Sequence, residues 1–344
     1  MPVLVQVVLL LAALVLLVAV AVSIQFFRHP LATTVWLRRN RLRRAGFAKS
    51  SVETSVGPQI VWRGGSGPLL VLLHGAGDQA GSWHKVAADL ARKYSLVIPD
   101  LAGHGESAPS SGPLSPGTIL STLEQVLDST TLHDDKPTPG SMEVHGKPER
   151  FVLAGISLGA WIAMLYAHRH PERISRLLLI DGGALKFEQT GITLTPKNRE
   201  EARRAFDAIL DPSSPRPAAF VLDDLIRVTN RGPMARLMAS EDEFSSYFLD
   251  DKLAGFSVPV DLIWGASDRL VPLEYARTLE AELPAARLTV LERCGHAPPL
   301  ECPEKFFSAL LSLLASDPPP DKRPAARMKI SASAERSNAK PSAG

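Results

Sequence analysis

Phe151-Val152-Leu153-Ala154-Gly155-Ile156-Ser157-Leu158-Gly159 is the stretch that decides the fold of this chain. The apolar run 151–154 predicts a buried strand, and the residues from Ala160 to His168 follow the apolar pattern of a helix. The turn between them carries G-x-S-x-G, which roughly one chain in ten of this length contains by chance. The strand–turn–helix setting makes the motif specific, because it exposes a serine hydroxyl above a sheet edge. We therefore predict Ser157 to be a nucleophile.

Short apolar runs alternate with helical stretches on both sides of this motif, from Gln59 onward. Such alternation is typical of a mostly parallel sheet covered by helices, so the predicted fold class is α/β. The expected strands are 69–73, 96–99, 151–154, 177–181, 260–264 and 287–291. The expected helices are 83–93, 158–170, 273–283 and 304–314.

A serine hydroxyl is a poor nucleophile until a base takes its proton. His296 is the predicted base, because it lies in Cys-Gly-His-Ala-Pro-Pro directly after the expected strand 287–291. The preceding glycine and following prolines favour a fixed loop at the carboxyl end of that strand. His74 and His104 are expected to brace their loops, as Asp100 is, and not to transfer protons.

A carboxylate must hold the imidazole in one tautomer and stabilise its charged form. Asp268 is the predicted acid, since it follows the expected strand 260–264 in Trp-Gly-Ala-Ser-Asp-Arg-Leu-Val-Pro. Asp181, at the end of the strand 177–181, is the alternative acid, with a structural role in the turn as its other interpretation.

Two backbone N–H groups are needed to stabilise an oxyanion. Leu158 follows the nucleophile at a helix N-terminus and supplies one. The other is expected in the loop His74-Gly75-Ala76-Gly77-Asp78, with Ala76 as the predicted donor and Gly77 as the next candidate.

The N-terminus carries an apolar run from residue 3 to residue 22, interrupted only by Gln6. About 20 apolar residues span a hydrocarbon core of roughly 30 Å, so we predict a single transmembrane anchor in residues 1–27. A cleaved signal peptide with a periplasmic enzyme is the alternative, because Ala19-Val20-Ala21 imitates a cleavage site. However, no Lys or Arg precedes the run, and the run exceeds the usual length of an h-region.

A basic juxtamembrane linker is expected at 28–58, with the cations Arg28, Arg38, Arg39, Arg41, Arg43, Arg44 and Lys49. Positive residues beside a spanning helix favour the cytoplasmic side, so the catalytic body is expected in the cytoplasm. Two interpretations of this flank stand together: contact with anionic headgroups, or a solvated linker helix.

Composition sets further limits on partners and cofactors. The formal net charge of +2 over 344 residues indicates no nucleic-acid partner. Two cysteines, Cys294 and Cys302, cannot build a disulfide framework and are compatible with a reducing compartment. No Cys/His cluster has zinc spacing, so no metal is expected. Nothing in the sequence indicates the oligomeric state.

Taken together, the motifs H-G-x-G, D-L-x-G-H-G-x-S, G-x-S-x-G, W-G-x-x-D and G-H-x-P resemble the α/β-hydrolase superfamily over residues 59–314. The anchor and the basic stretch with Arg43-Arg44-Ala45-Gly46 are similar to the membrane-anchored monoacylglycerol lipases of the ABHD family. This resemblance implies a core at 59–185 and 257–316, a helical cap at 186–256, and no cofactor. Proline, serine and basic residues predict a disordered tail at 317–344.

The resemblance implies acyl transfer, in which Ser157 attacks an ester carbonyl and water then hydrolyses the acyl-enzyme. A serine nucleophile argues against haloalkane dehalogenases and soluble epoxide hydrolases, which place aspartate there. The anchor favours a lipid-derived ester, monoacylglycerol-like, as substrate. A carbon–carbon bond hydrolase and a non-catalytic binding protein of the same fold are the alternatives. Apolar residues of the cap either line an acyl pocket or pack in its core: Phe220, Val221, Leu222, Leu225 and Ile226.

Overall fold

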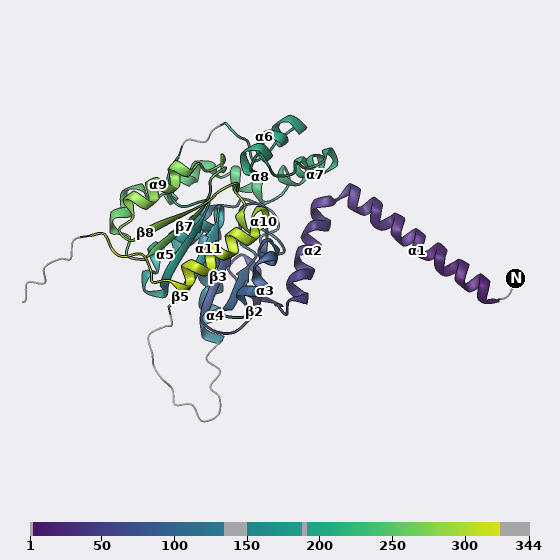
Figure 1. The fold of residues 1–344 in the computed structure, drawn as a ribbon, viewed down its shortest axis with the longest axis horizontal. Helices are drawn as coiled ribbons and strands as arrows, with labels where there is room; N and C mark the ends of the chain where they lie inside the picture. Colours follow the sequence, from purple (N-terminus) through teal and green to yellow (C-terminus); the bar gives the residue numbers. More distant parts are fainter. Residues whose placement is uncertain (1–2, 134–149, 188–190, 324–344) are drawn as a thin grey trace, which may run out of the picture.

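The computed structural model of this chain describes residues 3–133, 150–187 and 191–323. The prolines and glycines of residues 134–150 predict a surface loop. Most of this segment, and most of the tail expected at 317–344, lies outside the described residues. The rest forms one body with a long N-terminal helix that projects from it (Figure 1).

An eight-stranded sheet forms the centre of the body, in the order β1-β2-β4-β3-β5-β6-β7-β8. Strands β3 to β8 pair in parallel, which confirms the predicted α/β class. Their near-continuous apolar sequences suit strands that are covered on both faces. The bounds are β3 Leu69–Leu73, β4 Ser95–Pro99, β5 Phe151–Ile156, β6 Ile174–Ile180, β7 Val260–Gly265 and β8 Ala286–Leu291.

The sequence patterns did not predict the first two strands. Strand β1 (Ala48–Thr54) and strand β2 (Gly57–Gly64) form an antiparallel hairpin, and β2 pairs antiparallel with β4. The residues of β1 are mostly polar and at least partly exposed, as an edge strand of a sheet should be. A polar strand of this kind lacks the apolar run that identifies the central strands.

Helices cover both faces of the sheet (Figure 1). On one face lie α4 (Pro116–His133), α5 (Leu158–Arg169) and α9 (Leu273–Glu282). On the other lie η1 (Ala80–Lys85), α3 (Ala87–Leu90) and α11 (Pro303–Ala315). Two helix predictions needed correction: α4 was not expected, and the helix expected at 83–93 is split into η1 and α3.

Helices α6 (Arg199–Ile209), α7 (Ala219–Thr229) and α8 (Pro233–Met238) lie between β6 and β7. The short helices η3 (Glu241–Tyr247) and η4 (Asp250–Gly255) complete this segment. Figure 1 shows α6, α7 and α8 together over one edge of the sheet, where they cover the carboxyl ends of its central strands.

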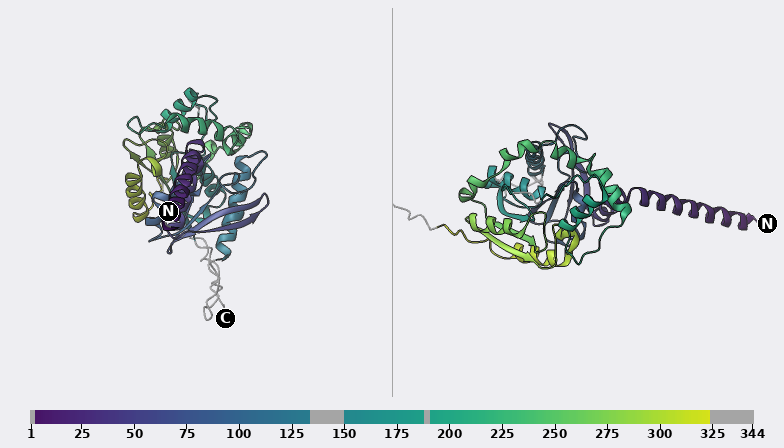
Figure 2. Two further views of the ribbon diagram at one scale, coloured as in Figure 1. Left: turned by 90° about the vertical axis from the view of Figure 1, so that its right-hand side faces the viewer. Right: turned by 90° about the horizontal axis from the view of Figure 1, so that it is seen from above.

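The N-terminal helix α1 (Val3–Arg28) has no buried residue, although almost every side chain in it is apolar. The right-hand view in Figure 2 shows it standing clear of the body. Among the described residues it is the one helix long and apolar enough to cross a membrane. At about 1.5 Å per residue it extends roughly 39 Å, more than a hydrocarbon core requires.

Helix α2 (Pro30–Arg44) docks on the body and is not a free linker. Leu42 is fully buried against the apolar cluster beneath η1. Arg39 reaches the carboxylate of Asp100 at 3.0 Å, and Arg38 reaches Asp78 at 3.5 Å. Arg38 and Arg39 of the basic flank therefore bind the protein's own carboxylates, so α2 is not a freely solvated linker helix, and contact of this flank with anionic headgroups stays a prediction.

Candidate active site

Ser157 occupies the turn between β5 and α5, with φ 54° and ψ −118°. The turn is crowded: a Cβ at Gly155 would lie 2.2 Å from the carbonyl oxygen of Gly159, and a Cβ at Gly159 would lie 2.5 Å from that of His74. Glycine is required at both positions, since a side chain would clash with backbone. The N–H of Ser157 donates to the Ile180 carbonyl at 2.9 Å, which ties the turn to β6.

His296 and Asp268 meet at the carboxyl ends of β8 and β7. The imidazole Nδ1 lies 2.7 Å from Oδ2 of Asp268, so the N–H donates to the carboxylate and Nε2 is left to act as a base. The other carboxylate oxygen of Asp268 accepts from the N–H groups of Leu270 and Val271, at 2.8 and 2.9 Å. The indole of Trp264 donates to the Val271 carbonyl at 2.9 Å and holds the same loop.

Ser157 and His296 line the same cavity, together with Ala76, the expected oxyanion donor. Leu158, the other expected donor, lines a second cavity that Ser157 and Ala76 share. The two loops approach closely, because a Cβ at Gly75 would lie 3.3 Å from the Ser157 Cβ. The residues predicted for nucleophile, base and oxyanion stabilisation are thus gathered from the three loops that follow β3, β5 and β8.

Asp181 closes β6 with a positive φ of 45°. Its Oδ1 accepts from the N–H of Gly265 at 2.8 Å, and the side chain is fully buried. The imidazole of His296 bonds to Asp268 and not to this alternative acid. Burial and the neighbouring Asp268 raise the pKa of Asp181 well above its ordinary value.

The bracing roles expected of the two buried histidines agree with their contacts. His74 accepts from the Leu101 N–H at 2.9 Å and donates to the Gly75 carbonyl at 2.8 Å, so it links two loops as a neutral imidazole. Burial lowers the pKa of His74 to about 4 and that of His104 to about 3. Neither ring is protonated to the charged imidazolium near neutral pH.

The last turn of α6 is hydrogen-bonded both to the loop that carries Asp268 and to the loop that carries His296. The sequence patterns did not predict these contacts. The N–H of His296 donates to the Ile209 carbonyl at 2.6 Å, and the N–H of Arg269 donates to the Ala208 carbonyl at 3.0 Å. Glu301 accepts from the N–H of Gly295 at 2.6 Å, directly beside the histidine. The segment above the sheet therefore supports both loops through backbone hydrogen bonds.

The two cysteines also hold this loop, because Cys294 and Cys302 form a disulfide with a Cα–Cα distance of 5.9 Å. This pairing was not expected from the cysteine count. The bond closes a loop of the chain that contains His296, Ala297 and the prolines after them.

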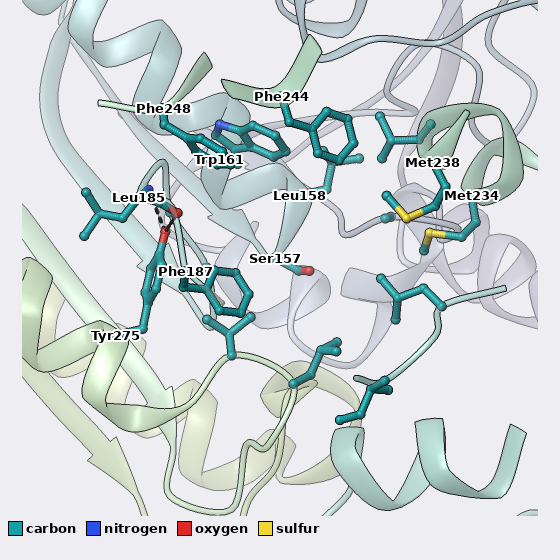
Figure 3. A pocket seen from close by; sticks show the side chains of 18 residues that line it. Ser157, Leu158, Trp161, Leu185, Phe187, Met234, Met238, Phe244, Phe248 and Tyr275 are labelled. Atoms are coloured by element: carbon teal, nitrogen blue, oxygen red, sulfur yellow. Dashed lines mark hydrogen bonds between the residues drawn. The ribbon is translucent and has the colours of Figure 1, made fainter. Parts of the chain in front are cut away.

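An apolar cavity of about 160 Å³ opens beside Ser157 (Figure 3). Figure 3 shows Trp161, Phe244 and Phe248 on one side of the serine and Met234 and Met238 on another. The indole of Trp161 stacks on Phe248 with ring centroids 5.2 Å apart. Since its walls are almost entirely hydrocarbon and aromatic, this cavity suits an alkyl or acyl chain.

The adjoining cavity of about 220 Å³ lies on the His296 side of the nucleophile. Its walls include Asp78, Trp83 and Leu300. Residues 220–226 of the cap line neither cavity among the described residues, so the acyl-pocket interpretation of that run is wrong. Phe220 instead packs against Phe27, with ring centroids 5.1 Å apart, at the junction of α7 and α1.

Within the described ranges, no group of three or more His, Cys, Asp or Glu side chains is placed so that it could hold a metal ion.

Comparison with known proteins identifies similar chains. The profile of the alpha/beta hydrolase family matches residues 70–309. Monoacylglycerol lipase ABHD6 of Homo sapiens is 25% identical over 273 residues, which are 74% of this chain and 77% of that protein. The pimeloyl-[acyl-carrier protein] methyl ester esterase of Nitrosomonas europaea is 29% identical over 265 residues, 72% of this chain and 96% of that one. A crystal structure of a membrane phospholipase A, described as a bacterial virulence factor, superimposes with a TM-score of 0.68 at 26% identity, covering 89% of this chain and 97% of that one.

Proposed function

Because the chain belongs to the alpha/beta hydrolase family and is a carboxylic ester hydrolase, we propose that it is anchored in a membrane and cleaves lipid-derived esters. In this proposal Ser157 is the nucleophile, His296 the base and Asp268 the acid. The observation that carries it is the 2.7 Å contact of His296 with Asp268 at a cavity that Ser157 also lines.

The reaction follows from the groups at this cavity. Nε2 of His296 takes the Ser157 proton as the hydroxyl oxygen attacks the ester carbonyl. The developing oxyanion accepts from the N–H groups of Leu158 and Ala76, each of which is worth roughly 2.7–4 kcal/mol in other enzymes. The imidazolium then protonates the leaving alcohol, and water activated by the same histidine hydrolyses the acyl-enzyme.

The two cavities hold different parts of the substrate, the alcohol in one and the acyl chain in the other. The leaving oxygen must lie within reach of His296 to receive its proton, so the alcohol occupies the cavity that the histidine lines. The acyl chain then extends into the apolar cavity around Trp161 and Met238. Burial of a chain among such side chains is favourable by about 0.8 kcal/mol per CH₂.

The anchor supports a membrane as the source of the substrate. Helix α1 exposes its apolar side chains along its whole length, and Phe26 and Phe27 at its end contact Phe220 of α7. The segment that roofs the cavity therefore lies next to the point where the chain would enter a bilayer.

For the orientation of the anchor we propose a cytoplasmic catalytic domain, because the basic residues follow the apolar run and none precede it. One observation favours the opposite side: the Cys294–Cys302 bond, since structural disulfides persist in oxidising compartments. A C-terminal fusion to alkaline phosphatase, active only outside the cytoplasm, and one to a fluorescent protein, active only inside it, decide between the two.

Hydrolysis itself is tested with the full-length protein in detergent. We expect cleavage of medium-chain monoacylglycerols and simple esters, labelling by a fluorophosphonate, and loss of both in Ser157→Ala. The panel also contains phospholipids and a vinylogous diketone, so that a preference for phospholipids or for carbon–carbon cleavage would be recognised. Activity that survives in Ser157→Ala would refute the proposed nucleophile.

Removal of the anchor must spare α2. A truncation of residues 1–45 would expose the surface that Leu42 covers and leave Asp100 without Arg39. A variant that lacks residues 1–28 keeps these contacts and is the appropriate soluble form.

A further inference from the structure

Two carboxyl groups lie side by side beneath the imidazole, at the ends of neighbouring parallel strands. Asp181 follows β6 directly, and Asp268 follows β7 by three residues. The backbone of Asp181 is held by a hydrogen bond from its N–H to the Ile263 carbonyl at 3.2 Å. Its side chain is held by the Gly265 N–H, which donates to Oδ1 at 2.8 Å. Asp181 is therefore fixed against the loop that carries Asp268.

The second oxygen of Asp181 has no conventional donor. Oδ2 is buried and without a hydrogen-bond partner among the described residues. Asp268 lies beyond the end of the adjacent parallel strand β7 and acts on this carboxyl both through its charge and as a side-chain hydrogen-bond partner. Asp268 already accepts three hydrogen bonds, from the N–H groups of Leu270 and Val271 at Oδ1 and from His296 at Oδ2, and a carboxylate has about four acceptor sites, so one remains.

The two ionisable groups that act most strongly on Asp181 are carboxylates, and both oppose a negative charge there. The closest is Asp268, and Glu301 of α10 (Pro298–Glu301) adds a more distant carboxylate. Tyr275 of α9 packs under the adjacent Gly183, but its hydroxyl is bonded to Leu185. Two buried carboxylates in contact do not both ionise, since mutual repulsion and lost hydration each favour one proton between them.

We propose that Asp181 is a positioning residue that keeps its proton at neutral pH and donates a hydrogen bond from Oδ2 to the carboxylate of Asp268. No proton is transferred in this arrangement. Asp181 O–H and the N–H groups of Leu270 and Val271 together fix the carboxylate, and His296 meets a group with one negative charge.

The consequence for catalysis rests on the proposed Ser157–His296–Asp268 triad. If both carboxyls were ionised, two negative charges would stabilise the imidazolium, and His296 would stay protonated at a pH where it must act as a base. A neutral Asp181 avoids this while it still orients Asp268. Asp181, which the sequence offers as the alternative acid, then has a different role at the same site.

Infrared spectroscopy tests whether Asp181 carries a proton, and the measurement does not depend on catalytic activity. We expect the full-length protein in detergent at about pH 8 to show the carbonyl stretch of a protonated carboxyl, since ordinary carboxyls are ionised there. The difference spectrum against Asp181→Asn isolates this band, and Asp78→Asn, at a half-buried carboxyl outside the pair, is expected to keep it. In Asp268→Asn the band should titrate at lower pH, because the opposing charge is gone. Absence of the band in the parent protein would overturn the proposal.

Kinetics test the positioning role. Asp181→Asn can still donate to Asp268 and accept from Gly265, so kcat/KM should stay within about threefold of the parent. Asp181→Ala removes both hydrogen bonds and should lower kcat about 10- to 100-fold with little change in KM. Equal loss in the two variants would overturn the proposal, and thermal unfolding of each variant separates misfolding from a catalytic effect.

The pH profile separates a neutral Asp181 from an ionised one. Replacement of a neutral carboxyl by a neutral amide should leave the acidic limb of kcat/KM unshifted. If Asp181 were ionised, Asp181→Asn would remove a negative charge near His296 and move that limb to lower pH by about half a unit or more. A parent protein that shows the infrared band but no hydrolysis would refute the proposed function and leave this assignment intact.

Discussion

Replacement of Arg39 by methionine tests whether α2 belongs to the folded body. The guanidinium is 13% exposed, contacts the fully buried carboxylate of Asp100 at 3.0 Å and donates to Gln79 at 3.2 Å. Methionine keeps an apolar stem to pack in the same place, so the change removes chiefly the charge and its hydrogen bonds.

The contacts of Asp100 set the expected magnitude. Removing one partner of a buried ion pair typically costs 3–5 kcal/mol. Asp100 still accepts from the N–H groups of Ala80 and Glu106, at 2.7 and 3.0 Å, so we expect the lower part of that range or less, about 2–3 kcal/mol. For a body of this size that corresponds to a fall of roughly 4–12 °C in Tm.

The loss should depend on pH. Burial raises the pKa of Asp100, and Arg39 opposes that rise. A raised pKa means that the folded state binds the proton more tightly than the unfolded state, so stability falls as pH increases from the ordinary carboxyl range through the raised value. Without Arg39 the pKa of Asp100 rises further, so the pH range over which stability falls becomes wider. Arg39→Met should therefore be most destabilising near pH 8 and least near pH 4.

The assay is thermal and chemical unfolding in detergent across this pH range. The matched control is Arg44→Met, which removes the same charge from an exposed position of the same helix and should leave Tm unchanged. If both variants unfold like the parent protein, or if Arg39→Met loses more stability at low pH than at high pH, the docking of α2 through Asp100 is refuted.

Three further changes address the site. Asp268→Asn should lower kcat by about four orders of magnitude, as the equivalent change does in the serine-protease template, with KM for a monoacylglycerol little altered; a small loss in hydrolysis assays would show that another group orients His296. Met238→Trp fills part of the apolar cavity, and if it displaces two methylenes it should lower kcat/KM for long acyl chains roughly tenfold relative to short ones; an unchanged chain-length profile would place the acyl chain elsewhere. Cys302→Ser opens the short loop around His296 and should cost about 2–3 kcal/mol of stability in oxidised protein, whereas a reductant should lower the Tm of the parent and not that of the variant.

Local pattern was sufficient for the central strands and for the nucleophile turn. The apolar runs at β3 and β7 are buried on both faces, and such strands carry their identity in a few consecutive residues. The turn at Ser157 is equally local, because the glycines beside it are required by backbone contacts within the turn and with β3. The edge strand β1 was not predicted, because its residues are mostly polar and solvent-facing and do not form a run of consecutive apolar residues.

By itself, then, the sequence determined the α/β class, the apolar N-terminal helix and the candidate residues Ser157, Asp268 and His296, because each depends on the periodicity or the sterics of neighbouring residues. Only the tertiary structure decided which partner each polar group meets. The contacts of the α2 arginines with Asp78 and Asp100, and of Asp181 with Asp268, join segments far apart in sequence. The pairing of Cys294 with Cys302, eight residues apart, requires the loop around His296 to bring its two ends together. Such choices depend on packing geometry and on the cost of leaving buried charges unpaired, and neither quantity is written in the local pattern of residues.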